Sequence, residues 1–172
     1  MEKSKEADKE TRVQGPGEGD RAPDFRAQAS GSTGSEVSLS DFAGRRVVLY
    51  FYPKDDTPGC TTEACDFRDS MVPLQKRGIV VLGVSKDALA SHDKFRTKYE
   101  LPFPLLSDPD GTICQAYGVF KEKTMYGVKR MGIERSTFVI GADGRILRAM
   151  RGVKATGHVA ALLADPCLAE RA

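Results

Sequence analysis

Two short apolar runs, separated by a segment of helical length, constrain the fold of this chain more than any other feature. Residues 47–52 and 79–85 are rich in β-branched, aliphatic and aromatic side chains, which is typical of strands buried on both faces. The segment between them predicts a helix over 60–77 that ends at Gly78. Pro73 within it predicts a kink or an early end. The chain therefore opens its core with a strand, a helix and a strand.

The same alternation continues to the end of the core. Helices are expected over 88–99, 112–117 and 156–163, a strand over 103–106, and a hairpin that joins 136–140 to 145–150. The hairpin signal is strong, because the Gly-Ala-Asp-Gly between its arms tolerates the positive φ of a tight turn. The order βαβαβα, then a β-hairpin and a helix, predicts an α/β fold with a central mixed sheet and helices on both faces.

The length of 172 residues indicates one domain. We predict that it spans 21–165, from the apolar anchor Ala-Pro-Asp-Phe to the Asp-Pro break at 165–166. Residues 1–20 contain six acidic and four basic side chains, too polar to offset the entropy of ordering. We therefore predict a flexible tail over these residues, with a charged helix as the alternative. A second, short tail is predicted at the C-terminus, over residues 166–172.

Charge and hydropathy exclude several classes of protein. Lys and Arg number 26 against 24 Asp and Glu, so no general electrostatic field is expected to bind nucleic acid. The basic stretch 121–130 suggests either an RNA contact or a solvated loop near the site, and we favour the loop. The apolar runs are far shorter than the roughly 20 residues of a membrane-spanning helix. No secretory apolar region follows Met1, so we expect a cytoplasmic protein.

The cysteines and histidines do not have the spacing of a zinc site. The chain has no CxxC pair, and its two histidines are remote in sequence from any cysteine pair. We predict that Cys114 fills the core, that Cys167 is exposed without a role, and that His92 is a packed or half-exposed structural residue.

Cys60 is the strongest candidate for a reactive residue. The first predicted strand ends at Pro53, a loop carries Thr57, and Cys60 falls at the start of the following helix. Loops at the carboxyl ends of strands form ligand crevices in open α/β sheets. The free N–H groups and positive dipole at a helix start stabilise a thiolate over a thiol. Cys60 is therefore a candidate nucleophile, and Thr57 can place its hydroxyl beside the sulfur.

These residues resemble a known family. Pro53-x-x-x-Thr57-x-x-Cys60 is similar to the active-site pattern of peroxiredoxins, and residues 51–68 resemble the bacterioferritin comigratory protein, or Q-type, subfamily. Matching segments occur in family order over about residues 20–164, among them Gly83-Val-Ser and Arg135-Ser-Thr-Phe-Val-Ile. The resemblance implies a thioredoxin-like fold and thiol-dependent reduction of hydroperoxides.

The resemblance also implies roles for individual residues. Cys60 corresponds to the peroxidatic cysteine, Thr57 and Arg135 to its polar partners, Pro53 to the residue that shields the site, and Cys65 to a resolving cysteine. From the residues alone, Thr57 could simply cap the helix and Arg135 could form a surface ion pair. No metal, haem or flavin is expected.

The expected reaction is attack of the Cys60 thiolate on hydrogen peroxide or an organic hydroperoxide. The sulfenic acid formed on Cys60 condenses with Cys65 to a disulfide, which thioredoxin or glutaredoxin reduces. The resemblance thus implies a thioredoxin-dependent peroxidase, and we expect the chain to be a monomer. The alternatives are a thiol redox sensor or relay without efficient peroxide turnover, and a non-enzymatic binding module on the same scaffold.

Overall fold

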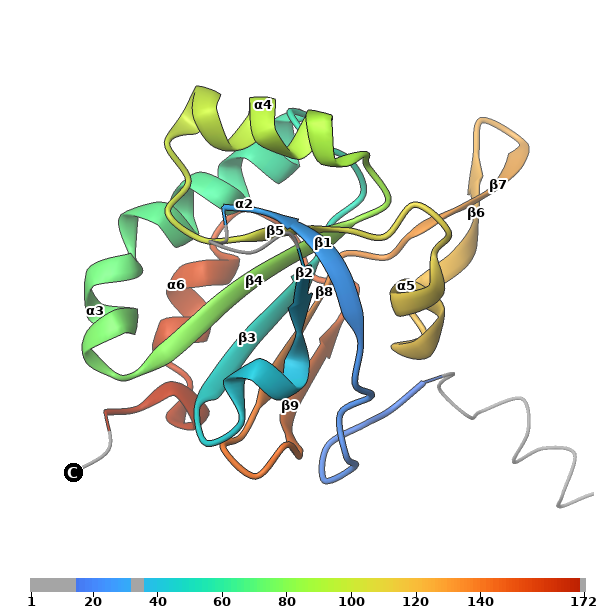
Figure 1. Ribbon diagram of the computed structural model, residues 1–172. Helices are drawn as coiled ribbons and strands as arrows, with labels where there is room; N and C mark the ends of the chain where they lie inside the picture. The colour runs from blue at the N-terminus through green and yellow to red at the C-terminus, as the bar shows by residue number, and fades with distance from the viewer. Residues whose placement is uncertain (1–14, 32–35, 171–172) are drawn as a thin grey trace, which may run out of the picture.

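A seven-stranded mixed sheet, in the order β2-β1-β5-β4-β3-β8-β9, forms the centre of the molecule (Figure 1). The computed structural model describes residues 15–31 and 36–170. The strands of this sheet are β1 (Arg26–Ser30), β2 (Glu36–Ser38), β3 (Arg46–Phe51), β4 (Ile79–Ser85), β5 (Leu105–Ser107), β8 (Ser136–Ile140) and β9 (Ile146–Arg151). Strand β3 pairs in parallel with β4 and antiparallel with β8, which confirms the predicted mixed sheet.

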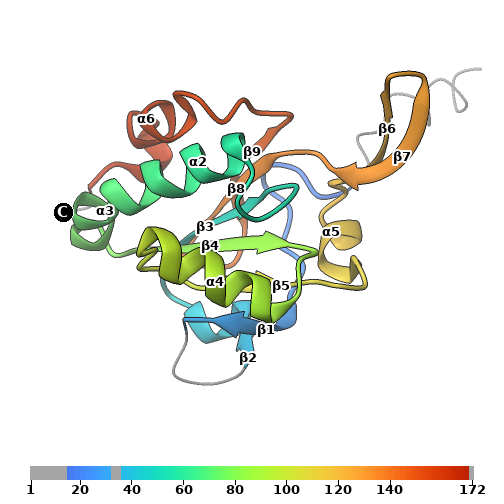
Figure 2. The same ribbon diagram turned by 90° about the horizontal axis from the view of Figure 1, so that it is seen from above.

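Helices cover both faces of this sheet. They are α2 (Pro58–Asp69), α3 (Met71–Lys76), α4 (Leu89–Tyr99), α5 (Thr112–Ala116) and α6 (His158–Leu163), with the 3-10 helices η1 (Leu39–Phe42) and η2 (Pro166–Leu168). Successive residues of β3 alternate between two apolar clusters, because side chains along a strand point to opposite faces. Val48 and Tyr50 pack with α2, α3, α4 and α6, whereas Val47 and Leu49 pack with α5 and η1. Figure 2 shows α5 set apart from α2, α3 and α6.

The long helix predicted over 60–77 is broken into α2 and α3. The break falls at Ser70, whose φ of −104° and ψ of 4° leave the helical geometry. Pro73 explains the position, because its ring clashes with the carbonyl group four residues earlier and its nitrogen has no hydrogen to donate. The kink predicted from Pro73 is thus confirmed.

The prediction of a solvated loop over 121–130 is wrong. The segment forms a two-stranded hairpin of β6 (Phe120–Met125) and β7 (Val128–Ile133), which projects from the body of the molecule (Figures 1 and 2). Tyr126 and Gly127 make the turn, with φ of 53° and 76°, and hairpin turns with two positive φ values match the twist of their strands. An aromatic residue is unusual at such a φ, so the turn was not apparent from the sequence.

The described residues outside the predicted domain boundaries are packed against the domain. Gly19 donates its backbone N–H to the carbonyl of Ile146 at 2.8 Å, although it was assigned to the polar tail. At the other end, Leu168 is fully buried and Arg46 donates to the carbonyls of Cys167 and Ala169. Residues 1–14 of the tail predicted over 1–20, and the last two residues of the chain, lie outside the described residues.

The burial of two cysteines can be compared with the sequence-based predictions. Cys114 is fully buried in the cluster around α5, and its burial raises the pKa of its thiol far above the usual range, so core filling is confirmed. Cys167 was predicted to be exposed, which is wrong: it is half-buried, and burial raises the pKa of its thiol to about 12. Within the described residues, no helix is long and apolar enough to cross a membrane.

Candidate active site

Cys60 lies at the start of α2, where the chain leaves the carboxyl end of β3. Thr57 is the residue that precedes the helix, with an extended backbone, and Pro58 occupies the first helical position. Proline suits that position, because its missing N–H has no acceptor there and its fixed φ is helical. Cys60 is the third residue of α2 and only 2% exposed. The helix start predicted for Cys60 is confirmed, and its side chain is almost completely buried.

Arg135 reaches this sulfur from the position just before β8, the strand that pairs with β3. Its Nη2 donates to Cys60 Sγ at 3.3 Å, and its Nη1 donates to Glu63 Oε1 at 2.7 Å. The side chain of Arg135 is 13% exposed, so the alternative of a surface ion pair does not describe it. Sheet pairing brings the two residues together, because Ser136 of β8 lies opposite Phe51 at the end of β3.

Gly59 has no side chain that would block the contact between Arg135 and Cys60. A Cβ atom at position 59 would lie 3.2 Å from Nη2 of Arg135 and 3.7 Å from Cβ of Ala155. The first distance is closer than carbon and nitrogen usually approach. Glycine beside Cys60 therefore permits the guanidinium to lie against the first turn of α2.

Glu63 is a site residue that the sequence analysis missed. It lies three residues after Cys60 on the same helix, so both side chains face Arg135. Its side chain is fully buried, and burial raises its pKa from 4.5 to about 7, although Arg135 acts in the opposite direction. Its Oε2 has no hydrogen-bond partner among the described residues. The spacing of Cys60 and Glu63 was the available signal.

We predict that Glu63→Gln removes a pH dependence of stability. Because the pKa of Glu63 is raised on folding, the folded protein binds more protons than the unfolded chain between about pH 4.5 and 7, and stability falls as the pH rises through that window. The change from 4.5 to about 7 corresponds to about 3 kcal/mol.

Urea unfolding at pH 5 and pH 8 checks this expectation. The free energy of unfolding of wild type should fall between the two pH values by about 2.5 kcal/mol more than that of Glu63→Gln. The exposed variant Glu122→Gln should follow wild type. Equal pH dependence in wild type and Glu63→Gln would show that folding does not raise the pKa of Glu63.

The hydroxyl of Thr57 is held by the backbone of its own loop. It donates to the carbonyl of Lys54 at 2.8 Å rather than to the sulfur, and it makes no capping hydrogen bond to the helix. Because the hydroxyl hydrogen is used, the lone pairs of the oxygen remain as acceptors for another group. Pro53 is exposed in the same loop, directly after Tyr52.

Cys65 lies farther along the same helix. Helix α2 is continuous from Pro58 to Asp69, and Cys60 and Cys65 are both free thiols. Cys65 is half-buried, whereas Cys60 is buried. The structure thus places the two predicted redox cysteines on one helix without a bond between them.

Two further basic residues surround Arg135. Lys123 of β6 donates its Nζ to the carbonyl of Ile133, and burial together with the charge of Arg135 lowers its pKa. His158, at the start of α6, bonds through Nε2 to Thr137 Oγ1 at 2.8 Å, and burial and Arg135 lower its pKa too. In both residues burial is the larger cause of the lowered pKa, and the charge of Arg135 adds to it.

Comparisons with known proteins agree with this geometry. The AhpC/TSA family model matches residues 18–149. Peroxiredoxin Bcp of Bacillus subtilis is 49% identical over 145 residues, which cover 84% of this chain and 91% of that protein. The bacterioferritin comigratory protein of Xanthomonas campestris is 46% identical, with a TM-score of 0.77 over 81% of this chain and 88% of that chain. Its trapped intermediate and ligand complexes were solved for insights into its alkyl peroxide reduction activity. A cysteine-to-serine mutant of PrxQ from Xylella fastidiosa has a TM-score of 0.79 at 45% identity, over 85% of this chain and 92% of that chain.

Proposed function

Because the chain belongs to the AhpC/TSA family, as a peroxiredoxin of the bacterioferritin comigratory protein or Q type, we propose that Cys60 is its peroxidatic cysteine and Cys65 its resolving cysteine. The chain has a thioredoxin-like fold and is a thiol-dependent peroxidase, with a peroxide as substrate and a thiol as reductant. The contact of 3.3 Å between Arg135 Nη2 and Cys60 Sγ is the observation that carries the assignment of Cys60. A redox sensor without efficient turnover is not favoured, since the relatives are peroxiredoxins.

In the first step, the Cys60 thiolate attacks the terminal oxygen of ROOH. An S–O bond forms, the O–O bond breaks, and the alkoxide leaves as ROH after it takes up a proton. Negative charge spreads from sulfur over two oxygens, so fixed donors lower the barrier. Arg135 and the N–H groups of the first turn of α2 are such donors, and Thr57 Oγ1 can accept the O–H of the hydroperoxide.

In the second step, the Cys65 thiol attacks the sulfur of the Cys60 sulfenic acid. An S–S bond forms and water leaves, and a dithiol reductant then restores both thiols by exchange. We take thioredoxin as that reductant, with glutaredoxin as the alternative. The monomeric state and the cytoplasmic location belong to the same proposal, because reduction of an intramolecular disulfide requires neither a second copy nor an oxidising compartment.

Pro53 completes the proposed site. It follows Tyr52 in the loop that leads to Thr57, and its ring offers no donor that could compete for peroxide. Both hydrogen peroxide and organic hydroperoxides are proposed as substrates. The alkyl peroxide reduction activity of the Xanthomonas relative supports the organic class.

A coupled assay tests the proposed reductant and turnover. The protein, thioredoxin, thioredoxin reductase and NADPH should consume hydrogen peroxide and cumene hydroperoxide over many cycles. Replacing thioredoxin by glutaredoxin and glutathione separates the two reductants. Oxidation of Cys60 that stops after one equivalent with both reductants would instead support the sensor.

Arg135→Lys is expected to be severely impaired although it keeps the charge. One ammonium group cannot hold Cys60 and Glu63 at the same time in the planar arrangement of the guanidinium. We expect the second-order rate constant for Cys60 oxidation to fall by about 100-fold or more, as for loss of a donor that stabilises transition-state charge. Stopped-flow measurement checks this, with the exposed Arg130→Lys as the control. A rate within about threefold of wild type would make Arg135 a structural residue.

A further inference from the structure

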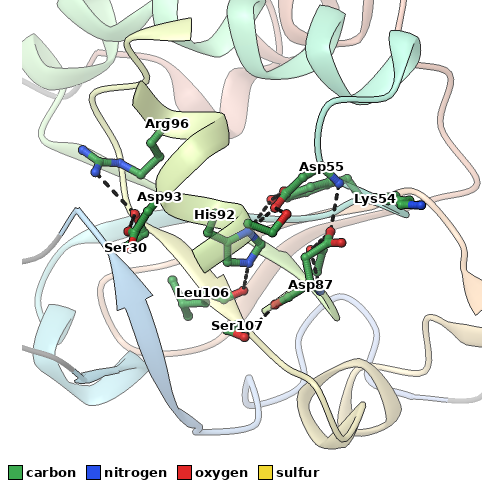
Figure 3. A network of polar contacts seen from close by, with 12 residues as sticks. Ser30, Lys54, Asp55, Asp87, His92, Asp93, Arg96, Leu106 and Ser107 are labelled. Atoms are coloured by element: carbon green, nitrogen blue, oxygen red, sulfur yellow. Dashed lines mark hydrogen bonds and ion pairs between the residues drawn. The ribbon is translucent and has the colours of Figure 1, made fainter. Parts of the chain in front are cut away.

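A buried hydrogen-bond network lies behind the loop that carries Pro53 and Thr57 (Figure 3). At its centre is Asp55, with a side chain that is 4% exposed. The carboxylate accepts from Tyr52 Oη at 2.6 Å and from Ser91 Oγ at 2.8 Å, and its Oδ2 lies 2.7 Å from His92 Nδ1. Both carboxylate oxygens are therefore occupied by groups of the fold.

His92 connects this carboxylate to the sheet. Its side chain is fully buried, and its Nε2 lies 2.9 Å from the carbonyl oxygen of Leu106 in β5. A carbonyl only accepts, so Nε2 is the donor there, and one further proton is shared between Nδ1 and Asp55. The histidine thus joins the loop, α4 and β5 through two short bonds, and its complete burial confirms the packed one of the two predicted positions.

The backbone of Asp55 is held as well. Its N–H donates to Asp87 Oδ2 at 2.8 Å, and the same oxygen accepts from Ser85 Oγ at 2.6 Å, at the end of β4. Figure 3 shows Asp55 between His92 and Asp87. Since the carboxylate and imidazole atoms that face one another are already engaged in these bonds, we assign the cluster to hydrogen bonding and not to a metal.

The next residue holds the loop from outside. Asp56 has a φ of 56°, a left-handed conformation that is uncommon for residues other than glycine. Its carboxylate accepts from Lys98 Nζ and Tyr99 Oη, both at 2.8 Å, at the end of α4. The loop is therefore attached to α4 by Asp55 on the inside and Asp56 on the outside, and Thr57 and α2 follow at once.

We propose that the Asp55–His92 pair is a positioning element for the peroxide site. It holds the loop against α4, so that Thr57 and the first turn of α2 keep the arrangement in which they meet the substrate. In the described structure neither side chain hydrogen-bonds to Cys60 or Arg135, so both are positioning residues. The inference rests on the proposed role of Cys60.

Two substitutions of His92 separate its two bonds. The amide nitrogen of His92→Asn lies near the position of Nδ1 and can still donate to Asp55. That of His92→Gln reaches the position of Nε2 and can donate only to the carbonyl of Leu106. For each variant, the rate of Cys60 oxidation by hydrogen peroxide is compared with its rate of alkylation by iodoacetamide, which needs a thiolate but no aligned peroxide.

We expect His92→Gln to react with peroxide about tenfold more slowly or worse, while alkylation is no slower than in wild type. His92→Asn should keep the peroxide rate within about threefold of wild type. The proposal is overturned if His92→Gln retains the wild-type peroxide rate, if both reactions slow equally, or if His92→Asn is as impaired as His92→Gln.

Ser91→Ala covers the case in which His92→Gln does not fold. It removes one donor to Asp55 from a helical position that alanine favours, so a folded protein is expected. Its peroxide rate should fall about fivefold or more with alkylation unchanged, and a peroxide rate within about threefold of wild type would refute the positioning role. Wild-type protein that does not oxidise at Cys60 would refute the proposed function itself, which is a different result.

Discussion

Cys60→Ser should lower the rate of peroxide reduction by at least about a thousandfold, as removal of a nucleophile does in other enzymes. A serine hydroxyl in the same position remains protonated at neutral pH, whereas a thiol is partly ionised and its sulfur is strongly nucleophilic. Arg135, Glu63 and the helix start remain in place in this variant, so only the attacking atom is changed. Peroxide consumption in the coupled assay measures the loss.

Cys65→Ser is the matched control for this prediction. It keeps the Cys60 thiol and its contact with Arg135, so its first step should run at the wild-type rate. After one equivalent of peroxide, intact mass should show loss of two hydrogens in wild type and gain of one oxygen in Cys65→Ser. No change is expected in Cys60→Ser. Substantial turnover by Cys60→Ser would move the reactive thiol elsewhere in the chain.

Formation of the Cys60–Cys65 disulfide should unwind the start of α2. Five residues along a continuous helix advance about 7.5 Å and turn through about 140°, which separates the two Cα atoms by about 8.6 Å. A disulfide requires about 4.4 to 6.8 Å. Both thiols lie on the unbroken helix Pro58–Asp69, so rotation of the side chains alone cannot close the gap.

The contacts at the two ends of α2 indicate how far the helix should unwind. The first turns are tied by Glu63 to Arg135, a contact that is broken when the helix opens. Phe67, two residues after Cys65, is fully buried and stacks on Tyr50 with ring centroids 4.6 Å apart. We therefore expect the backbone to open from Cys60 to the residues before Phe67, whereas β3 and β4 stay intact.

Amide hydrogen exchange on the oxidised and reduced protein measures this change. Protection of the backbone amides over residues 60–70 should fall about 100-fold or more on oxidation. Once the helix is unwound, these amides exchange without the free-energy cost of opening it. Strands β3 and β4 should keep their protection. Unchanged exchange in a protein that carries the disulfide by mass would contradict the unwinding.

Several features of the molecule could be predicted because they depend on neighbours in the chain. The apolar runs that became β3 and β4 have a local signature, as does the helix break near Pro73. The place of Cys60 at a helix start depends only on the strand before it and on Thr57 and Pro58. The resemblance to peroxiredoxins begins in the same segment and extends over about residues 20–164.

Other features depended on contacts between distant parts of the chain. Arg135 meets Cys60 because β8 pairs with β3, a pairing that no local pattern specifies over 75 residues. The β6–β7 hairpin was missed because Tyr126 adopts a φ that its side chain does not favour. The raised pKa of Glu63 and the bonds of His92 arise from complete burial, which is a property of the packed core.

The sequence alone therefore determined the order of elements from β3 to α5 and from β8 to α6, and the candidate nucleophile, since periodicity and turn chemistry act over a few residues. Tertiary structure decided what surrounds the sulfur: Arg135, the buried carboxylate of Glu63, and the Asp55–His92 pair that holds the loop. These groups come from segments far apart in the chain, and only the strand order of the sheet brings them together.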